Sequence, residues 1–233
     1  MEAAEVGLRI AGALWRFWYV RGYLSEGREQ LAGVLALSTL PTSSNVSTVS
    51  SAQAPAPASQ SQSWQSFRAK ALNGAGNLVY SQGDYAAARS LHEESLAIRR
   101  ELGDKSGIAA SLHNLGNVAY SQGEYAAARS LYEESLSIKR ELGDKRDIAV
   151  CLAGLGGVAA GMGQALRGAR LLGGVEALLE AVGAVLQPED RIPYEQGVGS
   201  ARAQLGEEEF ERAWQEGRAM SMEEAVEYAL GES

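Results

Sequence analysis

The sequence contains a tandem duplication. Residues 68–107 and 108–147 align without a gap and are identical at 26 of 40 positions. Repeats of about 20 to 50 residues are typical of stacked architectures, because one unit cannot bury its own hydrophobic face and needs neighbours on which to pack. Roughly three units are needed for a stable stack. The duplication therefore predicts a repeat protein whose flanking sequence supplies further, diverged units.

Each block has the pattern of two helices joined by a tight turn. Ser-Gln-Gly-Asp at 81–84 marks the first turn, since glycine tolerates backbone conformations that other residues avoid. Leu-Gly-Asp closes each block with a glycine suited to end one helix and an aspartate suited to begin the next. We expect the first helices of the two blocks at about 66–82 and 105–122, and the second helices at about 85–102 and 125–142.

Small residues recur at one register of both blocks. Gly76 and Ala88 lie 12 residues apart, as do Gly116 and Ala128, with one of each pair in the middle of each helix. Because glycine inside a helix costs about 1 kcal/mol relative to alanine, its recurrence indicates a close approach between helices. Together with the glycine and tyrosine at the turn, this spacing resembles the tetratricopeptide repeat family. The 40-residue period is similar to the elongated repeats of kinesin light chains and of the Leu-Gly-Asn-type spindle-orientation adaptors.

The flanks extend the repeat in weaker form. Residues 8–37 fit the same frame, with Trp15 at the place of Gly76 and Arg21-Gly22-Tyr23 at the turn. Trp18 and Leu31 would then be core positions. Residues 148–186 continue the frame downstream. No charged residue occurs from 30 to 67, and the Ser/Ala/Pro/Gln-rich part of this stretch cannot bury enough apolar surface to offset the entropy of ordering. We divide the chain into a degenerate N-terminal hairpin (1–37), a disordered linker (38–65), two well-formed repeats (66–147), a degenerate third repeat (148–186) and a C-terminal helical cap (187–233).

After Pro188 the repeat pattern ends. We expect polar helices at 188–206 and 207–220, and a last helix opened by a capping box of Ser221 and Glu224. The fold class that follows is all-α, and the resemblance implies a right-handed α-solenoid of about four helical hairpins with this helical cap.

Charge and composition exclude several classes of partner. The net charge is −8, and an acidic chain does not neutralise phosphates, so we expect neither nucleic acid nor an anionic membrane surface as a partner. The longest uncharged apolar run, 148–163, holds 16 residues, whereas a bilayer span needs roughly 20. The N-terminus is acidic where a secretory signal would be basic. A single cysteine, Cys151, fits a reducing compartment, so we expect a cytoplasmic protein.

Catalysis finds little support in the residue types. Neither His92 nor His113 has a metal-ligand companion three or four residues away, and His92 takes the register of Tyr132, which favours a packing role. Cys151 lies in an apolar helix with no basic neighbour to activate it. The paired glutamates that recur in each block are adjacent, and adjacent helical residues do not face each other. We therefore expect no enzyme, no metal and no cofactor.

A binding groove is the stronger hypothesis, because first helices line the concave face of tetratricopeptide stacks. Helical spacing puts one set of side chains on that face in each block, and asparagine offers a donor and an acceptor together to an extended peptide backbone. The arrangement resembles the asparagine ladder of the elongated-repeat adaptors. The alternative is that Asn77 and Asn117 bond within the stack and orient loops. The predicted groove residues are Lys70, Asn73, Asn77, Tyr80, His113, Asn114, Asn117, Tyr120 and Val150.

A carboxylate clamp of the co-chaperone type is disfavoured. Asn77 and Asn114 match the two asparagines of that clamp, but its basic positions fall at Asn73, Val150 and Gly154. These are uncharged.

The groove face changes character along the chain. In the third repeat it reads Val150, Ala153, Gly157 and Ala160, whereas Lys70 is the base near its entrance. The predicted ligand is therefore an extended protein or peptide segment, polar at one end and hydrophobic at the other. We also allow self-association through the N-terminal hairpin that carries Trp15 and Trp18.

A second resemblance gives an alternative function. The phrases at 11–18, 71–78 and 217–225 resemble the C-terminal region of large bacterial signalling ATPases and transcriptional regulators, in which repeats follow an NTPase. That resemblance implies a regulatory arm that senses a ligand. No Gly-x4-Gly-Lys-(Ser/Thr) loop is present, so the NTPase module is absent from this sequence.

Overall fold

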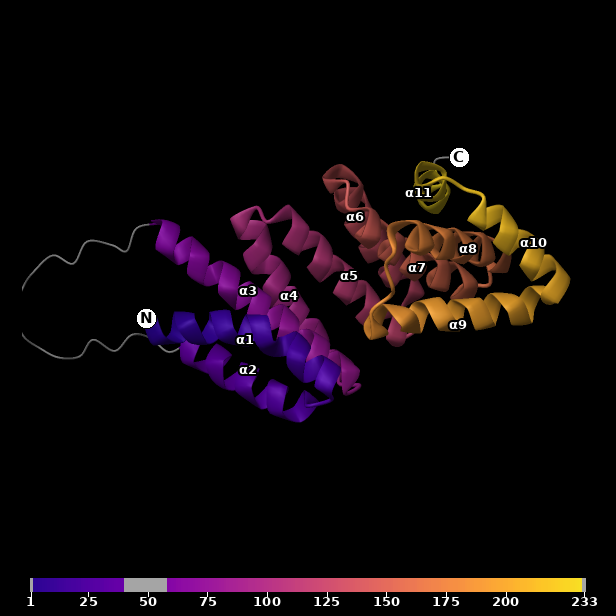
Figure 1. The fold of residues 1–233 in the computed structure, drawn as a ribbon. Coiled ribbons are helices and arrows are strands. Elements are labelled where there is room, and N and C mark those ends of the chain that lie inside the picture. The colour runs from indigo at the N-terminus through magenta and orange to yellow at the C-terminus, as the bar shows by residue number, and fades with distance from the viewer. Residues whose placement is uncertain (1, 40–57, 232–233) are drawn as a thin grey trace, which may run out of the picture. The chain divides into compact units, whose positions relative to one another are not determined.

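The computed structural model describes residues 2–39 and 58–231, which form eleven helices and no strand (Figure 1). The expected all-α class is confirmed over these residues. The chain divides into two compact units, Met1–Asp104 and Lys105–Ser233. The central part of the expected linker, 40–57, lies outside the described residues.

The first unit is built from two helical hairpins. They comprise α1 (Glu2–Arg21), α2 (Leu24–Thr39), α3 (Ala58–Ser81) and α4 (Tyr85–Leu102). Helix α3 packs against α1, α2 and α4. The hairpin α1–α2 turns at Gly22, whose φ is 74°, where we expected the turn of the degenerate repeat.

The core of the first unit explains why α3 begins earlier than expected. Leu8, Leu31 and Leu72 are fully buried there, and Trp64 and Phe67 pack against the same cluster. We expected this helix to start near 66, but it starts at Ala58, so the C-terminal end of the expected linker is helical. The apolar contacts of Trp64 and Phe67 favour order over a segment whose composition alone predicts disorder.

Local signals set the ends of α4. The Asp84 side chain accepts from the backbone N–H of Ala87 at 3.2 Å, which satisfies one of the free donors of the first turn. Gly103 ends the helix in a left-handed conformation with φ 67°. Because both signals act within a few residues, the expected bounds at 85 and 102 match the observed helix.

The second unit contains seven helices. They are α5 (Lys105–Ser121), α6 (Tyr125–Leu142), α7 (Lys145–Gly161), α8 (Ala165–Val182), α9 (Pro188–Leu205), α10 (Glu207–Arg218) and α11 (Met222–Leu230). The pairs α5–α6 and α7–α8 form hairpins, and α6 packs against α7. These helices follow the expected repeats closely.

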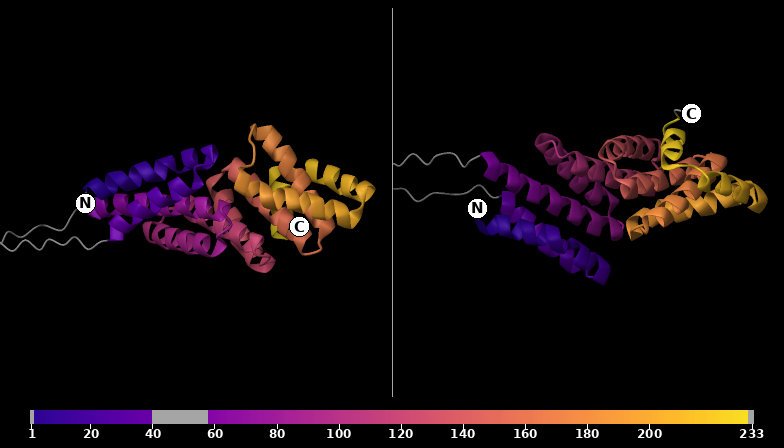
Figure 2. Two further views of the ribbon diagram at one scale, coloured as in Figure 1. Left: turned by 90° about the horizontal axis from the view of Figure 1, so that it is seen from below. Right: turned by 45° about the horizontal axis from the view of Figure 1, so that its top comes forward.

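Helix α9 lies alongside α7 and α8 (Figures 1 and 2). It packs against α7 and α8, and it also touches α5. The crossing with α7 is closed by two glycines: a Cβ on Gly157 would overlap the carbonyl oxygen of Pro193, and a Cβ on Gly197 would lie 2.7 Å from the Cα of Gly157. Small residues on both helices therefore let the two backbones touch.

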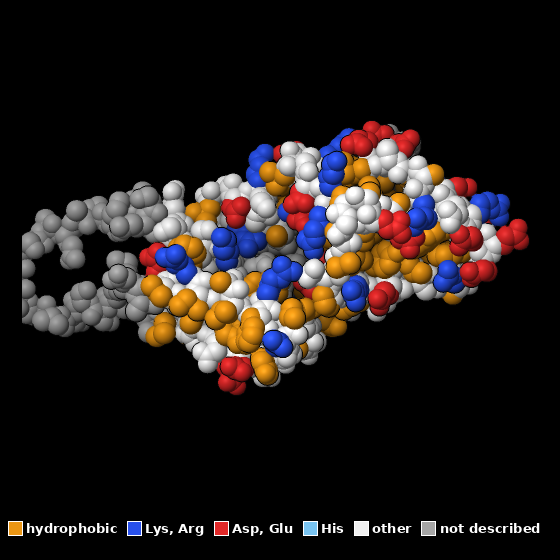
Figure 3. Space-filling view, in the orientation of Figure 1, with side chains coloured by type: hydrophobic (Ala, Val, Ile, Leu, Met, Phe, Trp, Pro, Cys, Tyr) orange, Lys and Arg blue, Asp and Glu red, His pale blue; other side chains and the backbone are white. Residues whose placement is uncertain are grey.

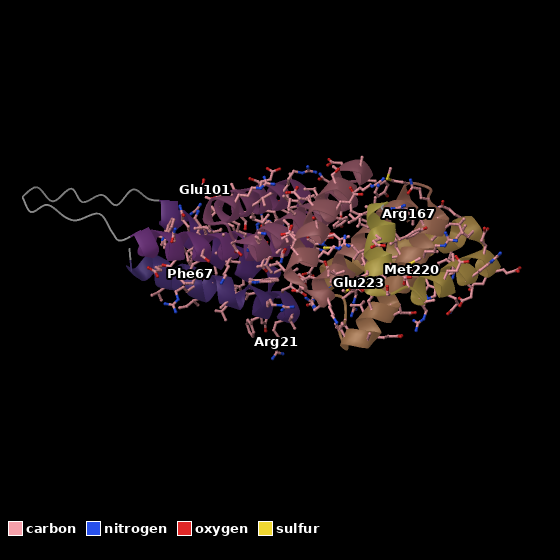
Figure 4. The ribbon with its side chains drawn as sticks, turned by 90° about the horizontal axis from the view of Figure 1, so that it is seen from above. Arg21, Phe67, Glu101, Arg167, Met220 and Glu223 are labelled. Atoms are coloured by element: carbon pink, nitrogen blue, oxygen red, sulfur yellow. The ribbon has the colours of Figure 1, made fainter. Side chains whose placement is uncertain are left out.

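Helices α10 and α11 close the unit from the side of α8. The Arg218 side chain pairs with Glu176 of α8, and Arg170 of α8 pairs with Glu216 at 2.6 Å. The expected capping box is present, with Ser221 and Glu224 bonding each other's backbone N–H groups. Arg167 donates to the carbonyls of Tyr228 and Ala229 at 2.7 and 2.8 Å, which satisfies the last turn of α11 (Figure 4).

One face of α1 is apolar and exposed. Trp18 is buried. Trp15 packs against Gly74 so closely that a Cβ added to this glycine would lie 2.7 Å from the indole ring. Both tryptophans therefore point into the first unit. Figure 3 shows hydrophobic side chains gathered along this helix. The exposed apolar side chains of α1 are Val6, Ile10, Leu14, Phe17 and Val20.

The crossing of α9 with α7 predicts opposite effects for two neighbouring glycines. Gly197→Ala places a methyl group against backbone, so we expect it to lower the free energy of unfolding by about 1–3 kcal/mol. Gly199 has no heavy atom within 4 Å of an added Cβ, so Gly199→Ala should raise it by up to about 1 kcal/mol. Urea unfolding of the two variants measures both. Equal effects would mean that α9 does not dock as described.

Candidate functional site

A buried polar cluster lies where α9 meets the predicted groove of the second unit. Asp190, in the first turn of α9, faces α5 and accepts from His113 Nε2 at 2.8 Å and from Asn117 Nδ2 at 3.2 Å. Both bonds end on the same oxygen, Oδ1. His113 is 8% exposed and Asp190 is 6% exposed, so the pair is largely shielded from water. We call His113, Asn117 and Asp190 the α5–α9 cluster.

Helix α5 presents the two donors because they lie one helical turn apart, at i and i+4. Tyr132 of α6 supports them from behind, and its hydroxyl donates to Asn117 Oδ1 at 2.6 Å. The amide of Asn117 thus accepts on one side and donates to Asp190 on the other, which fixes its orientation. The tyrosine ring fits because Gly116 and Gly154 lack side chains: a Cβ on either would lie 2.6 Å from it.

The protonation of His113 is set by two opposing effects. Burial lowers the pKa of the imidazole, but the Asp190 carboxylate, through its charge and its hydrogen bond, raises it more, so the pKa reaches about 10. His113 Nδ1 faces Cys151 Sγ at 3.9 Å, and this contact acts in the same direction. The cluster therefore holds an imidazolium against a carboxylate at neutral pH.

In the first unit, the position equivalent to Tyr132 is occupied by His92. This histidine is buried beside Gly76, and a Cβ added to Gly76 would lie 2.5 Å from its ring. Burial, followed by the charge of Arg99, lowers the pKa of His92 to about 3, so this imidazole is neutral. Its Nδ1 has no hydrogen-bond partner within the described residues. These contacts support the packing role that the register suggested.

The predicted groove residues have different exposures in the two units. In the first unit, Lys70 is exposed, Asn73 is half-buried, and Asn77 and Tyr80 are buried. The Tyr80 ring packs on Tyr85 with ring centres 5.6 Å apart.

In the second unit, Asn114 is half-buried, whereas His113, Asn117, Tyr120 and Val150 are buried. The structure brings His113 and Asn117 into one hydrogen-bonded cluster, and Val150 lies in the core cluster against which Ile192 and Tyr194 of α9 pack.

Sequence reasoning missed Asp190, which lies 77 residues from His113 and 73 from Asn117. An acidic residue in the first turn of a helix is ordinary, because it complements the helix dipole, so the sequence offers no signal for its longer-range contacts. Helix α9 also covers the apolar groove face that we expected in the third repeat. Gly157 packs directly against α9. The carbonyl oxygen of Ala160 accepts a hydrogen bond from Gln204 Nε2 of α9 at 3.0 Å.

Neither a metal centre nor a membrane segment is found within residues 2–39 and 58–231. There, no three His, Cys, Asp or Glu side chains are grouped so that they could hold a metal ion. No helix of this part of the chain is long and apolar enough to cross a membrane.

The paired helices and their glycine contacts define a helical-repeat protein. The tetratricopeptide repeat family profile matches residues 67–141 and 107–167. Residues 67–167 are therefore tetratricopeptide repeats, as the duplication and its spacing predicted.

The similarity to curated proteins is local. Helix-turn-helix-type transcriptional regulators of Mycobacterium bovis and of two strains of Mycobacterium tuberculosis are 39% identical to this chain over 67 residues. The matched stretch covers 29% of this chain and 8% of each regulator. This chain thus corresponds to a small part of those proteins.

Two solved structures share the fold. Both are nearly identical TPR-like repeats from a kinesin light chain of Podosopora anserina. One has a TM-score of 0.61 at 19% identity and covers 94% of this chain and 96% of its own. The other, a variant of the same repeats, has a TM-score of 0.62 at 18% identity and covers 100% of both chains. At this identity the likeness concerns the fold alone.

The α5–α9 cluster predicts a pH-dependent stability. Below pH 6.5, His113 carries its proton in both the folded and the unfolded chain, so the full contribution of the ion pair is present. As the pH rises, the unfolded chain loses that proton first, and the folded chain keeps it until the pH approaches its pKa of about 10. The free energy of unfolding should therefore fall across this range, by up to about 1.4 kcal/mol per pH unit.

Urea unfolding at several pH values between about 6.5 and 10 measures this loss. His113→Gln keeps a donor but no titrating charge, so its unfolding free energy should change less over the same range. A parallel decline in both chains would assign the pH dependence to other groups.

Proposed function

We propose that this chain binds a segment of another protein on the predicted groove faces of the first helices of its repeats, α3 in the first unit and α5 and α7 in the second. The tetratricopeptide fold makes a protein-interaction module the expected class of function. The observation that supports binding on this face is the α5–α9 cluster. There, the predicted groove residues His113 and Asn117 bind the carboxylate of Asp190, which comes from a helix far away in the sequence. Side chains that hold one segment in this way have the geometry to hold another.

The order of contacts along α9 supports the same proposal. Its first turn makes the polar contacts with α5, and its later turns meet the small apolar residues of α7. A ligand that is polar at one end and apolar at the other is the kind that the groove residues predict. The bound segment here is helical, whereas the sequence favoured an extended one, and helices are common ligands of apolar grooves.

Lys70 gives a test of partner binding, because it is a predicted groove residue that is exposed on α3. A partner is first captured from the native host by cross-linking and identified by mass spectrometry, and its binding segment is then titrated against purified chains. We expect Lys70→Glu to weaken that binding by roughly tenfold, the effect of about 1.4 kcal/mol.

Lys145→Glu is the matched control, since this lysine is exposed at the first turn of α7, outside the predicted groove positions. The proposal fails if both variants bind the segment as the unaltered chain does, or if both lose it equally.

The similarity to mycobacterial regulators favours a second candidate. Those proteins are described as helix-turn-helix-type transcriptional regulators, and this chain matches 8% of their length. A repeat arm that regulates a separate DNA-binding or nucleotide-binding protein fits that relationship. Co-purification of such a protein with this chain from its host supports this candidate, and its absence from a cross-linked capture that recovers other partners counts against it.

Self-association through the first unit is a further part of the proposal. The tryptophans that suggested it point inward, so the surface that supports it is the exposed apolar face of α1. A 20-residue helix with such a face pairs with a second copy by two-fold symmetry, in which the same patch serves both chains.

Phe17 is half exposed at 50% and lies on that face. We expect sedimentation of the unaltered chain to show a concentration-dependent dimer, and Phe17→Glu to raise its dissociation constant by at least roughly tenfold, the effect of about 1.4 kcal/mol. Glu29→Lys, a charge change of similar size on an exposed position of α2, should leave the dimer intact. A monomer at every concentration would rule out self-association.

A further inference from the structure

Helix α9 meets the groove through one side of its sequence. Its buried residues are Asp190, Pro193, Gly197 and Ala201, which follow each other at intervals of three, four and four. This is the spacing of one helical face. The face therefore consists of a carboxylate followed by three small or compact residues.

The groove fits a carboxylate at one end and compact residues further along. His113 and Asn117 offer two donors to a single carboxylate oxygen. Further along, Gly157 has no room for a side chain from α9, because a Cβ on Gly197 would already lie 2.7 Å from its Cα. A bulky residue at this position of a ligand would hold it away from α7. A segment that fits thus needs an acidic residue and, seven positions later, a glycine.

Helix α9 is also poorly suited to exist alone. It contains an internal proline and two glycines, which disfavour an isolated helix, and its low content of large apolar residues gives it little surface with which to collapse. Its helical form depends on the contacts with α5, α7 and α8. Elements of this kind open at lower free energy than the core helices beneath them.

A buried ion pair fixes position more than it adds stability, because the cost of removing both charges from water offsets much of their attraction. If the Asp190 carboxylate leaves, His113 and Asn117 lose the one acceptor that they share. The site therefore favours a replacement segment that brings another carboxylate to the same place.

We propose that His113 and Asn117 form a recognition site for an acidic side chain of a partner segment, and that α9 fills this site in cis until the partner displaces it. This inference rests on the proposed function and names the ligand class: a helical segment with an acidic residue followed at three, seven and eleven positions by compact residues. The covalent link gives α9 a high effective concentration, so a partner must match its face well to compete.

The test uses a fluorescent peptide of residues 187–206 as the probe and the full chain as the receptor. In Asp190→Asn/Gly197→Ala, the cis helix is weakened at its carboxylate and at its closest crossing. We expect this double variant to bind the peptide at least roughly tenfold more tightly than the unaltered chain does. The gain should disappear when His113→Gln is added, or when the peptide itself carries Asp190→Asn.

Gly199→Ala is the matched control, because it alters a glycine of the same helix that has open space beside it and leaves both contacts intact. It should bind the peptide no better than the unaltered chain. If the double variant keeps its helical circular dichroism but gains no affinity for the peptide, the proposal is overturned.

Hydrogen exchange of the unaltered chain provides a second measurement that needs no variant. Amides of α9 should exchange at least roughly tenfold faster than those of α7. If the two helices exchange together, α9 is a fixed part of the unit and the proposal is overturned.

The acidic recognition site and the proposed function can fail independently of each other. A host partner whose binding is lost in Lys70→Glu but unchanged in His113→Gln would leave the groove function standing and would exclude the acidic recognition site. The peptide experiment, in turn, needs no host partner.

Discussion

The second unit depends on the absence of side chains at a few helical positions. Gly116 and Gly154 together make the space that the Tyr132 ring fills, and Gly157 with Gly197 lets α9 touch α7. An added methyl group at any of these four positions would meet an atom closer than 3 Å. The glycine that weakens each helix in isolation is thus what allows the helices to pack. Tertiary contact outweighs local propensity here, which is the usual balance in repeat proteins.

That packing also explains how a polar cluster is kept inside an apolar unit. The Tyr132 hydroxyl reaches Asn117 because the ring can lie against backbone, and Asn117 in turn aims its amide at Asp190. Each of these contacts joins a donor to an acceptor. Within an environment of low dielectric such a satisfied cluster specifies one arrangement, because any slip would leave a charge or a donor unpaired. The cluster therefore positions α9 rather than merely attaching it.

The sequence predicted most of what is local. The bounds of α4 and α6, the turn at Gly22 and the capping box at Ser221 follow from signals within four or five residues, and each is found where those signals lie. The early start of α3 was missed because it depends on contacts of Trp64 and Phe67 with residues from α1 and α2.

For the candidate site, the pattern identified His113 and Asn117 but not their ligand, since Asp190 shares no periodicity with them. The small residues of α7 predicted an apolar ligand surface. They did not indicate that the chain itself supplies the segment that covers it, because a periodic pattern describes one surface and not its partner.

The difference between His92 and Tyr132 has a consequence for how the chain reaches this structure. Two blocks that are identical at 26 of 40 positions invite exchange of one hairpin for the other during folding, a common source of kinetic traps in tandem repeats. A neutral imidazole packs beside Gly76, whereas a phenol fills the space between Gly116 and Gly154 and bonds Asn117. A hairpin docked on the wrong neighbour would present a ring of the wrong size and polarity. His92 and Tyr132 thus distinguish the two hairpins by the size and polarity of one buried ring.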